Sequence, residues 1–215
     1  DSYSKGYIDA LVDAQSHIDG YFFLEESLSP ALLDAMQKVC PITPNQDGAE
    51  TPAYVYSHYF LGRRATALAR IDLLNKLSQN FDVTVYTHAD CKDILPTAIY
   101  GGKIDYYDTM PTVFQHSKLN LNITLKTIQT GIPLRAWDIL GCGGFLLTNF
   151  QQELCDFFIP GEDFVYYESP ADAIEKAAYF LSHDRERQEI THNAFEKIAA
   201  SHTFHHRVQS MFEII

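Results

Sequence analysis

The stretch KLNLNITLKTIQTGIPLRAWDILGCGGFLLTN, residues 118–149, decides the fold. It contains a short apolar run that ends in polar residues, a segment with helical periodicity, and a glycine-rich turn that leads into a second apolar run. This order predicts a strand, a helix, a tight turn and another strand. In a parallel sheet, ligands bind beyond the carboxyl ends of the strands. We therefore expect Asn122, Thr124 and the start of the following helix to lie at a ligand site, where the helix N-terminus favours an anion.

The sequence on both sides continues this alternation of strand and helix. Runs with strand character occupy residues 53–57, 81–87, 99–107 and 164–167. Segments with helical character occupy residues 64–79, 111–116, 151–158, 170–181 and 186–200. Strands separated by helices imply right-handed crossovers and a parallel sheet with helices on both faces. The predicted fold class is therefore α/β.

The first fifty residues have a different character. Two amphipathic helices are predicted at residues 5–18 and 29–40, the second with Ser29 as its N-cap and Pro30 in its first turn. The stretch PITPNQDGAETP, residues 41–52, has the composition of a linker.

We accordingly predict a helical segment with a linker at residues 1–50 and an α/β domain with a C-terminal helix at residues 53–215. The chain begins without a methionine and inside what reads as a helix, so we expect it to be part of a longer protein.

The composition argues against several classes of protein. Apolar residues make up 46% of the chain, which is typical of a globular protein, and the net charge of −12 argues against binding to nucleic acid. The sequence has neither an apolar stretch of about 20 residues nor a signal-peptide pattern, so we expect a cytoplasmic protein without a transmembrane segment. The four cysteines and the histidines lack the spacing of a disulfide framework or a zinc site, so no metal is expected.

Several residues are candidates for anion contacts. Gly62-Arg63-Arg64 follows the first predicted strand at a turn that opens a helix, where backbone amides and a guanidinium group can hold a pyrophosphate; solvated surface charge is the alternative. His58 lies at the same strand end, where a histidine satisfied by its own loop is the default interpretation. Lys118 is a further candidate cation, or only the exposed end of a buried strand.

Gly143-Gly144 permits the turn before the second apolar run and could let a phosphate approach the backbone. A tight turn alone explains the two glycines equally well.

Four segments taken together resemble a known family. They are SKLNLNIT (117–124), GIPLRAWDILGCGGFLLTN (131–149), PGEDFVYYES (160–169) and HTFHHR (202–207). They resemble the carboxy-terminal domain of the glycosyltransferase group related to the spore maturation protein CgeB, within the GT-B class. The resemblance covers about residues 53–210 and implies a Rossmann-like domain that binds a nucleoside-diphosphate sugar without a metal or other cofactor. It also implies an amino-terminal domain of a longer parent protein, which supplies most contacts to an unidentified acceptor.

The resemblance assigns roles to individual residues. Many relatives carry two acidic residues at positions that fall here on Thr130 and Asp138, and the second holds the ribose hydroxyls. Asp138 retains the carboxylate, with a capping or surface role as the alternative. Thr130 is not acidic, so the usual contact to the donor sugar is not implied. Arg135, one helical turn before Asp138, can pair with a diphosphate or with Asp138 itself.

The resemblance places residues 101–107 where related domains cradle the base. Ile104, Tyr106 and Tyr107 can form a flat wall there, or can instead be side chains of a buried strand.

The resemblance thus implies the donor-binding part of a glycosyltransferase. The alternative is a non-catalytic module that binds a nucleotide or nucleotide sugar. A receiver-like signalling domain ranks below both, because Asp90, Asp105 and Asp108 do not reproduce its acidic cluster.

Overall fold

The computed structural model describes residues 2–43 and 50–213 and confirms the α/β class, with parallel strands flanked by helices. By its internal contacts the chain forms two compact units. The first unit comprises Asp1–Leu73 and Thr124–Gln129, and the second comprises Leu74–Ile123 and Thr130–Ile215.

The first long segment of the first unit ends at Leu73. The sequence instead suggests a boundary in the linker at residues 41–52. Residues 44–49 of that linker lie outside the described part of the chain. The predicted domain limits therefore stay a prediction.

The described elements of the first unit are helical. They are α1 (Ser2–Ser16), α2 (Pro30–Val39), α3 (Pro52–Tyr54), the π-helix η1 (Val55–Leu61) and the first part of α4 (Gly62–Ser78). The Ser29 hydroxyl accepts the backbone N–H of Leu32 at 3.4 Å, and Pro30 occupies the first turn of α2, as predicted. The apolar core of this unit consists of Val12, Leu24, Leu28, Tyr56, Leu61 and Ala65.

The strand predicted at residues 53–57 is wrong, because this segment is helical. Its β-branched and aromatic residues favour a strand. However, the Thr51 hydroxyl accepts the N–H of Tyr54 at 3.1 Å, and Pro52 occupies the first helical position. This N-cap and proline are a helix start signal, and here they outweigh the strand propensity of the residues that follow.

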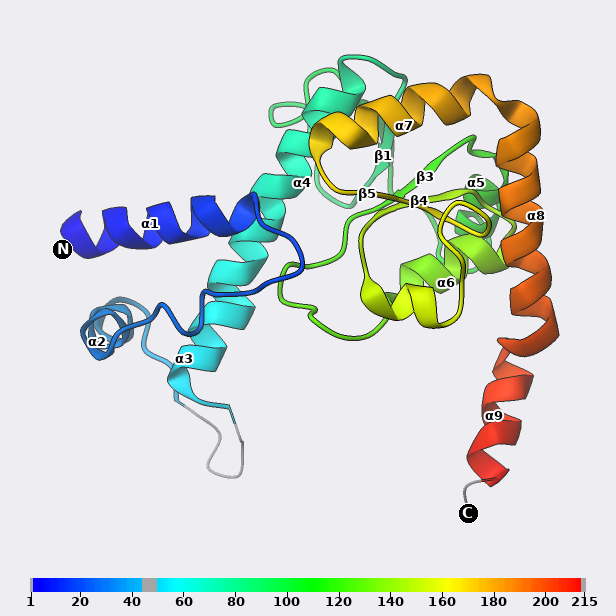
Figure 1. The fold of residues 1–215 in the computed structure, drawn as a ribbon. Helices are drawn as coiled ribbons and strands as arrows, with labels where there is room; N and C mark the ends of the chain where they lie inside the picture. The colour runs from blue at the N-terminus through cyan, green and yellow to red at the C-terminus, as the bar shows by residue number, and fades with distance from the viewer. Residues whose placement is uncertain (1, 44–49, 214–215) are drawn as a thin grey trace. The chain divides into compact units, whose positions relative to one another are not determined.

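The second unit contains two small parallel sheets (Figure 1). One pairs β1 (Thr84–Tyr86) with β2 (Ile99–Gly102), and the other has the order β3 (Asn120–Asn122), β4 (Leu146–Asn149) and β5 (Val165–Tyr167). β4 is buried along its whole length, as expected for the middle strand of a parallel sheet covered on both faces.

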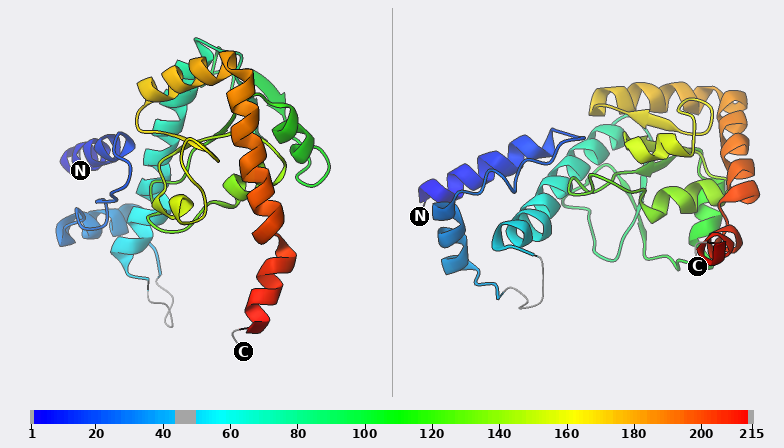
Figure 2. Two further views of the ribbon diagram at one scale, coloured as in Figure 1. Left: turned by 45° about the vertical axis from the view of Figure 1, so that its right-hand side comes forward. Right: turned by 60° about the horizontal axis from the view of Figure 1, so that its bottom comes forward.

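Helices flank these strands. They are α5 (Met110–His116), α6 (Leu134–Gly141), the 3-10 helix η2 (Gln152–Asp156), α7 (Pro170–Ser182), α8 (Asp184–Ser201) and α9 (Phe204–Glu213). In Figure 1, α7 lies above and α6 below the strands of the β3-β4-β5 sheet, and α8 packs against both helices. Figure 2 shows α9 continuing from the end of α8.

The core of the second unit lies between α6, α8 and the β3-β4-β5 sheet. Its buried members are Met110, Phe114, Ala136, Ile139, Leu140, Leu146, Leu154, Phe158, Phe164 and Ala194. Throughout residues 2–43 and 50–213, every helix is too short or too polar to cross a bilayer.

Candidate functional site

The parallel strands give the β3-β4-β5 sheet two different edges. Asn122, Asn149 and Tyr167 end their strands at the carboxyl edge. Lys118 and the Gly143-Gly144 pair precede their strands and therefore lie at the opposite, amino-terminal edge. The candidates taken from the sequence are thus divided between the two edges of one sheet.

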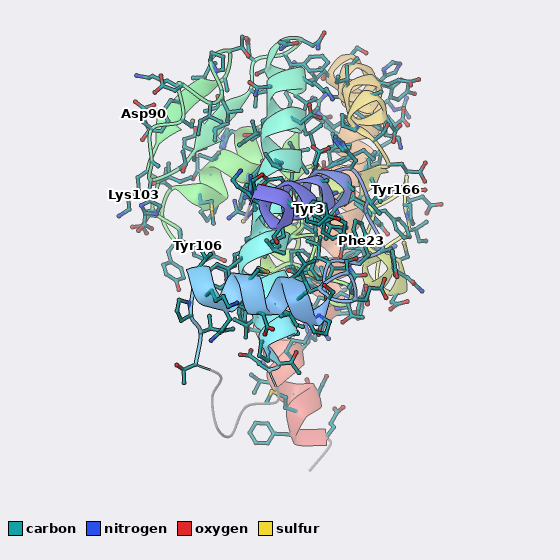
Figure 3. All side chains as sticks on the ribbon, turned by 90° about the vertical axis from the view of Figure 1, so that its left-hand side faces the viewer. Tyr3, Phe23, Asp90, Lys103, Tyr106 and Tyr166 are labelled. Atoms are coloured by element: carbon teal, nitrogen blue, oxygen red, sulfur yellow. The ribbon has the colours of Figure 1, made fainter. Side chains whose placement is uncertain are left out.

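Tyr106 and Asp138 meet in the structure, although 32 positions separate them in the chain. The Tyr106 hydroxyl donates a hydrogen bond to Oδ2 of Asp138 at 2.6 Å. This bond, followed by partial burial, raises the pKa of the Tyr106 phenol above its ordinary value, because the phenolate would face the carboxylate. Tyr106 remains 45% exposed, and Figure 3 shows it at the surface, on the same loop as Lys103. The pair is therefore accessible from solvent.

Asp105 holds the loop that carries Tyr106. Its Oδ1 atom accepts the backbone N–H groups of Tyr107 and Asp108, both at 2.8 Å, and these two bonds lower the pKa of the Asp105 carboxyl. Its carbonyl oxygen accepts the N–H of Met110 at 2.9 Å, at the start of α5. From the sequence, Asp105 is a candidate only for the acidic cluster of a receiver-like domain. An aspartate followed by N–H groups two and three residues later is a local turn signal that could have identified this role.

Arg135 lies in the first turn of α6 and is exposed. Within the described part of the chain it forms no hydrogen bond or ion pair, so the alternative of a pair with Asp138 does not occur. Its charge acts on Tyr106, lowering the pKa of the phenol against the larger effect of Asp138. Arg135, Asp138 and Tyr106 are therefore close together, and the guanidinium group is available to a ligand.

The other two members of the predicted wall differ from each other. β2 ends at Gly102, so Tyr106 and Tyr107 lie in a loop, and the buried-strand interpretation of them is wrong. Tyr107 is 83% exposed, and its ring meets that of Tyr106 edge to face, with centroids 5.1 Å apart. Ile104 is partly buried against the core of the second unit. The loop thus presents two aromatic rings to solvent.

Asn122 lies at the expected edge but is already engaged within the sheet. Its side-chain amide donates to the Thr148 hydroxyl at 2.9 Å, and the residue is only 3% exposed. Asn122 therefore links β3 to β4. Thr124 is equally buried and belongs to the first unit. A ligand contact by either residue stays a prediction.

Backbone hydrogen bonds and close packing both account for the glycine turn. Gly143 has a φ of 71°, and its N–H bonds to the Leu140 carbonyl at 3.1 Å, while the N–H of Gly144 bonds to the Ile139 carbonyl at 2.8 Å. These two bonds form a Schellman motif at the end of α6. A Cβ atom on Gly144 would lie 2.7 Å from the Asn120 amide nitrogen. Because both N–H groups are used, the tight-turn interpretation describes this site.

The turn predicted at Gly62-Arg63-Arg64 is wrong because this segment is helical, whereas an anion contact by either arginine stays a prediction. Gly62 has helical backbone angles, and its N–H bonds to the Ser57 carbonyl, so η1 runs directly into α4 without a turn. Arg64 pairs with Asp9 at 2.8 Å. Arg63 lies over the Tyr59 ring, 5.8 Å from its centroid. The strand end and the turn on which the predicted pyrophosphate contact was based do not occur here.

His58 is also satisfied by its own surroundings, in η1 rather than after a strand. Its ring stacks on Tyr54 with centroids 4.0 Å apart, and Nδ1 lies 2.9 Å from the Ser57 hydroxyl and 3.7 Å from Glu25. This arrangement agrees with the default interpretation of a locally satisfied histidine.

The HTFHHR segment contributes a ring to an aromatic cluster of the second unit. The His202 ring lies among Trp137, Phe157 and Phe158, with centroids 5.3 to 5.9 Å apart, and Nδ1 meets a guanidinium nitrogen of Arg207 at 2.8 Å. Over residues 2–43 and 50–213, no group of three His, Cys, Asp or Glu side chains could hold a metal ion.

Comparison with known proteins adds one finding to this geometry. A family model described as glycosyl transferase-like matches residues 64–213, which is more than half of the chain. The match includes Tyr106, Arg135 and Asp138 and excludes His58 and Arg63. No curated protein matches the chain.

Proposed function

Because this chain belongs to the glycosyl transferase-like family, we propose that its second unit binds the nucleoside-diphosphate sugar from which a glycosyl group is transferred. The observation that carries the proposal is the meeting of Tyr106, Arg135 and Asp138. They combine a hydrogen-bonded carboxylate, an unpaired guanidinium group and an exposed aromatic ring on the loop after β2 and on α6. These groups can bind the ribose hydroxyls, the phosphates and the base of a nucleotide.

Each group has a distinct role in the proposal. The Tyr106 hydroxyl occupies Oδ2 of Asp138 and fixes its orientation, which leaves Oδ1 to accept a hydrogen bond from a ribose hydroxyl. The planar fork of Arg135 pairs with the diphosphate, on which negative charge builds as it leaves the sugar. The ring of Tyr107, with that of Tyr106, offers a flat surface to the base.

The proposal extends to the rest of the enzyme. We place the chain in the CgeB-related group of the GT-B class, where an amino-terminal domain of a longer parent protein contacts the acceptor. If the reaction inverts the sugar, the general base that accepts the proton of the acceptor hydroxyl belongs to that domain. This chain alone then binds nucleotide and turns over little or no substrate.

Calorimetric titration of the chain with UDP, GDP, ADP, CDP and their sugars tests the donor site. We expect one nucleotide to bind, and the substitution Asp138→Asn to weaken that binding about tenfold, because a charged acceptor is lost. Arg135→Gln should weaken the diphosphate more than the nucleoside. The matched control is Glu175→Gln, which removes an exposed carboxylate on α7 and should leave the affinity unchanged. Failure of every nucleotide to bind the folded chain would contradict the proposal.

One feature favours a second function, a module that binds a nucleotide sugar without transferring it. The resemblance places Thr130, which is not acidic, where many relatives carry the first acidic residue, so it does not imply the usual contact to the sugar. Assay of transfer and of sugar-nucleotide hydrolysis in the longer parent protein separates the two functions. Nucleotide binding with persistent inactivity would favour the module.

A further inference from the structure

A cavity of about 370 Å³ opens at the amino-terminal edge of the β3-β4-β5 sheet, opposite the carboxyl ends of the strands. Its walls are the end of α5, the residues before β3, the glycine turn before β4 and one face of α8. Lys118 and Gly143, which are candidates for anion contacts in the sequence, both line this cavity. None of the described residues that line it is an aspartate or a glutamate.

Two cationic side chains line the cavity. Lys118 is exposed and forms no ion pair with any residue that the structure describes. Arg187 is only 8% exposed, and its guanidinium group donates to the Phe180 carbonyl at 2.5 Å and pairs with Asp184 at 2.6 Å. A guanidinium group has five N–H donors, so these two contacts leave donors that can face the cavity.

Asp184 lies close to the cavity without lining it. Its hydrogen bond to Arg187 holds the pKa of the Asp184 carboxyl below its ordinary value, and the charge of Lys118 adds to the effect. Lys118 therefore stands near the Arg187–Asp184 pair. One carboxylate against two cations leaves a local excess of positive charge, in a chain whose net charge is −12.

The remaining walls carry polar and aromatic groups. Gln115, Gln188 and Thr191 offer amide and hydroxyl groups that can bind hydroxyls. Phe195, which is 40% exposed, offers an apolar face. The volume exceeds that of a single phosphate group and lies within the usual range for small-ligand sites.

We propose that this cavity binds a small phosphate-bearing compound that also carries hydroxyl groups. Lys118 and the remaining N–H donors of Arg187 contact the phosphate oxygens, since charge-assisted bonds to an anion are the strongest that these groups form. The side-chain amides of Gln115 on α5 and Gln188 on α8 bind the hydroxyl groups of the compound. The site is independent of the proposed donor site, because it lies at the other edge of the sheet and at the other end of α6.

Calorimetry with inorganic phosphate and with glycerol phosphate tests this assignment in the whole chain. We expect both to bind, glycerol phosphate more tightly, and Lys118→Gln to weaken each about tenfold. Gln188→Glu should abolish binding, because it places a carboxylate in the cavity. The matched controls are Lys92→Gln and Gln209→Glu, which make the same charge changes at exposed positions elsewhere in the second unit and should bind like the wild type.

Arg187 is left unchanged in this test, because its buried guanidinium group also holds the Phe180 carbonyl near the end of α7. Two outcomes would overturn the proposal. One is an absence of saturable binding at millimolar phosphate by the folded chain. The other is phosphate binding that survives Lys118→Gln and Gln188→Glu but is lost on Arg135→Gln, which would place the anion at the donor edge.

Discussion

The hydrogen bond from Tyr106 to Asp138 joins two residues that the sequence treats separately. Asp138 was identified by a motif, and Tyr106 only by its position in a segment beside the base. Their contact depends on how the loop after β2 and the helix α6 approach each other. No local pattern encodes that approach, so the residue types could be predicted and the bond could not.

The raised pKa of the Tyr106 phenol predicts how this hydrogen bond contributes to stability as the pH changes. A pKa raised on folding means that the bond stabilises the fold below about pH 10 and is lost as the pH rises through the folded-state value. We expect Asp138→Asn to lower the Tyr106 pKa towards its ordinary value, because the neighbouring negative charge disappears. Tyrosine ring-carbon NMR during a pH titration measures this, with Tyr106→Phe to assign the signal.

Tyr179 provides an internal control for that titration. Its hydroxyl donates to Glu186 at 2.8 Å, and this bond raises the pKa of the Tyr179 phenol in the same way. Glu186→Gln should lower the pKa of Tyr179 and leave that of Tyr106 unchanged. An unchanged Tyr106 signal in Asp138→Asn would mean that the two side chains do not meet in solution.

At the scale of the element, the end of α6 shows why two adjacent glycines have different functions. Gly143 supplies a left-handed backbone angle, whereas Gly144 supplies space against Asn120 and the Phe114 carbonyl oxygen. The sequence predicted the turn because glycine is its local signal. It could not separate the two roles, because the Gly144 contacts come from α5 and β3.

Alanine substitutions distinguish these two roles. We expect Gly144→Ala to destabilise the second unit by about 2 to 3 kcal/mol through overpacking, and Gly143→Ala by about 1 to 2 kcal/mol through backbone strain. Gly141→Ala is the control, since its Cβ would lie 3.8 Å from Ile198, an ordinary contact, in a helical position. Urea unfolding followed by the fluorescence of Trp137, the chain's single tryptophan, measures all three. If Gly144→Ala and Gly141→Ala lowered the free energy of unfolding equally, the role of Gly144 in close packing would be contradicted.

The junction of α8 and α9 should respond to acid. Burial, followed by the charges of Arg207 and His206, lowers the pKa of His202. A lowered histidine pKa contributes stability that is present above about pH 6.5 and is lost as the pH falls through the folded-state value. We expect Trp137 fluorescence, which reports on the neighbouring ring of His202, to change over this range.

The histidine variants decide whether His202 is the group responsible. His202→Gln should remove the acid-dependent change in Trp137 fluorescence. His192→Gln, at an exposed position on α8 with no ring contact among the described residues, should retain it. Loss of the change in His192→Gln alone would show that another group titrates.

At the scale of the whole molecule, the sequence does not predict where the chain divides into its two compact units. Helices and parallel strands follow from periodicity, but the strand predicted at residues 53–57 is helical and the strand predicted at residues 99–107 ends at Gly102. The assignment of 124–129 to the first unit depends on contacts far apart in the chain. The Lys126 ammonium meets Asp19 at 2.7 Å, and the Lys126 N–H meets the Thr66 hydroxyl at 2.9 Å.

The Lys126–Asp19 pair should therefore stabilise the first unit more than a surface pair does. The Lys126 side chain is 5% exposed, so removal of its partner leaves a nearly buried charge. We expect Asp19→Ala to cost about 1 to 3 kcal/mol in urea unfolding, a range that allows for the partial exposure of Asp19. Lys5→Ala breaks the exposed pair with Asp9, which is worth about 0 to 1 kcal/mol. Similar costs for the two variants would show that residues 124–129 are not anchored by this pair.

Because residues 124–129 belong to the first unit, the order of synthesis on the ribosome affects how both units fold. The first unit lacks one of its own segments until Gln129 has been made, by which time β1, β2 and β3 of the other unit have already been synthesised. The second unit must then wait for β4, β5 and the helices that follow. The two units therefore cannot fold one after the other during synthesis, as domains that are contiguous in the chain do.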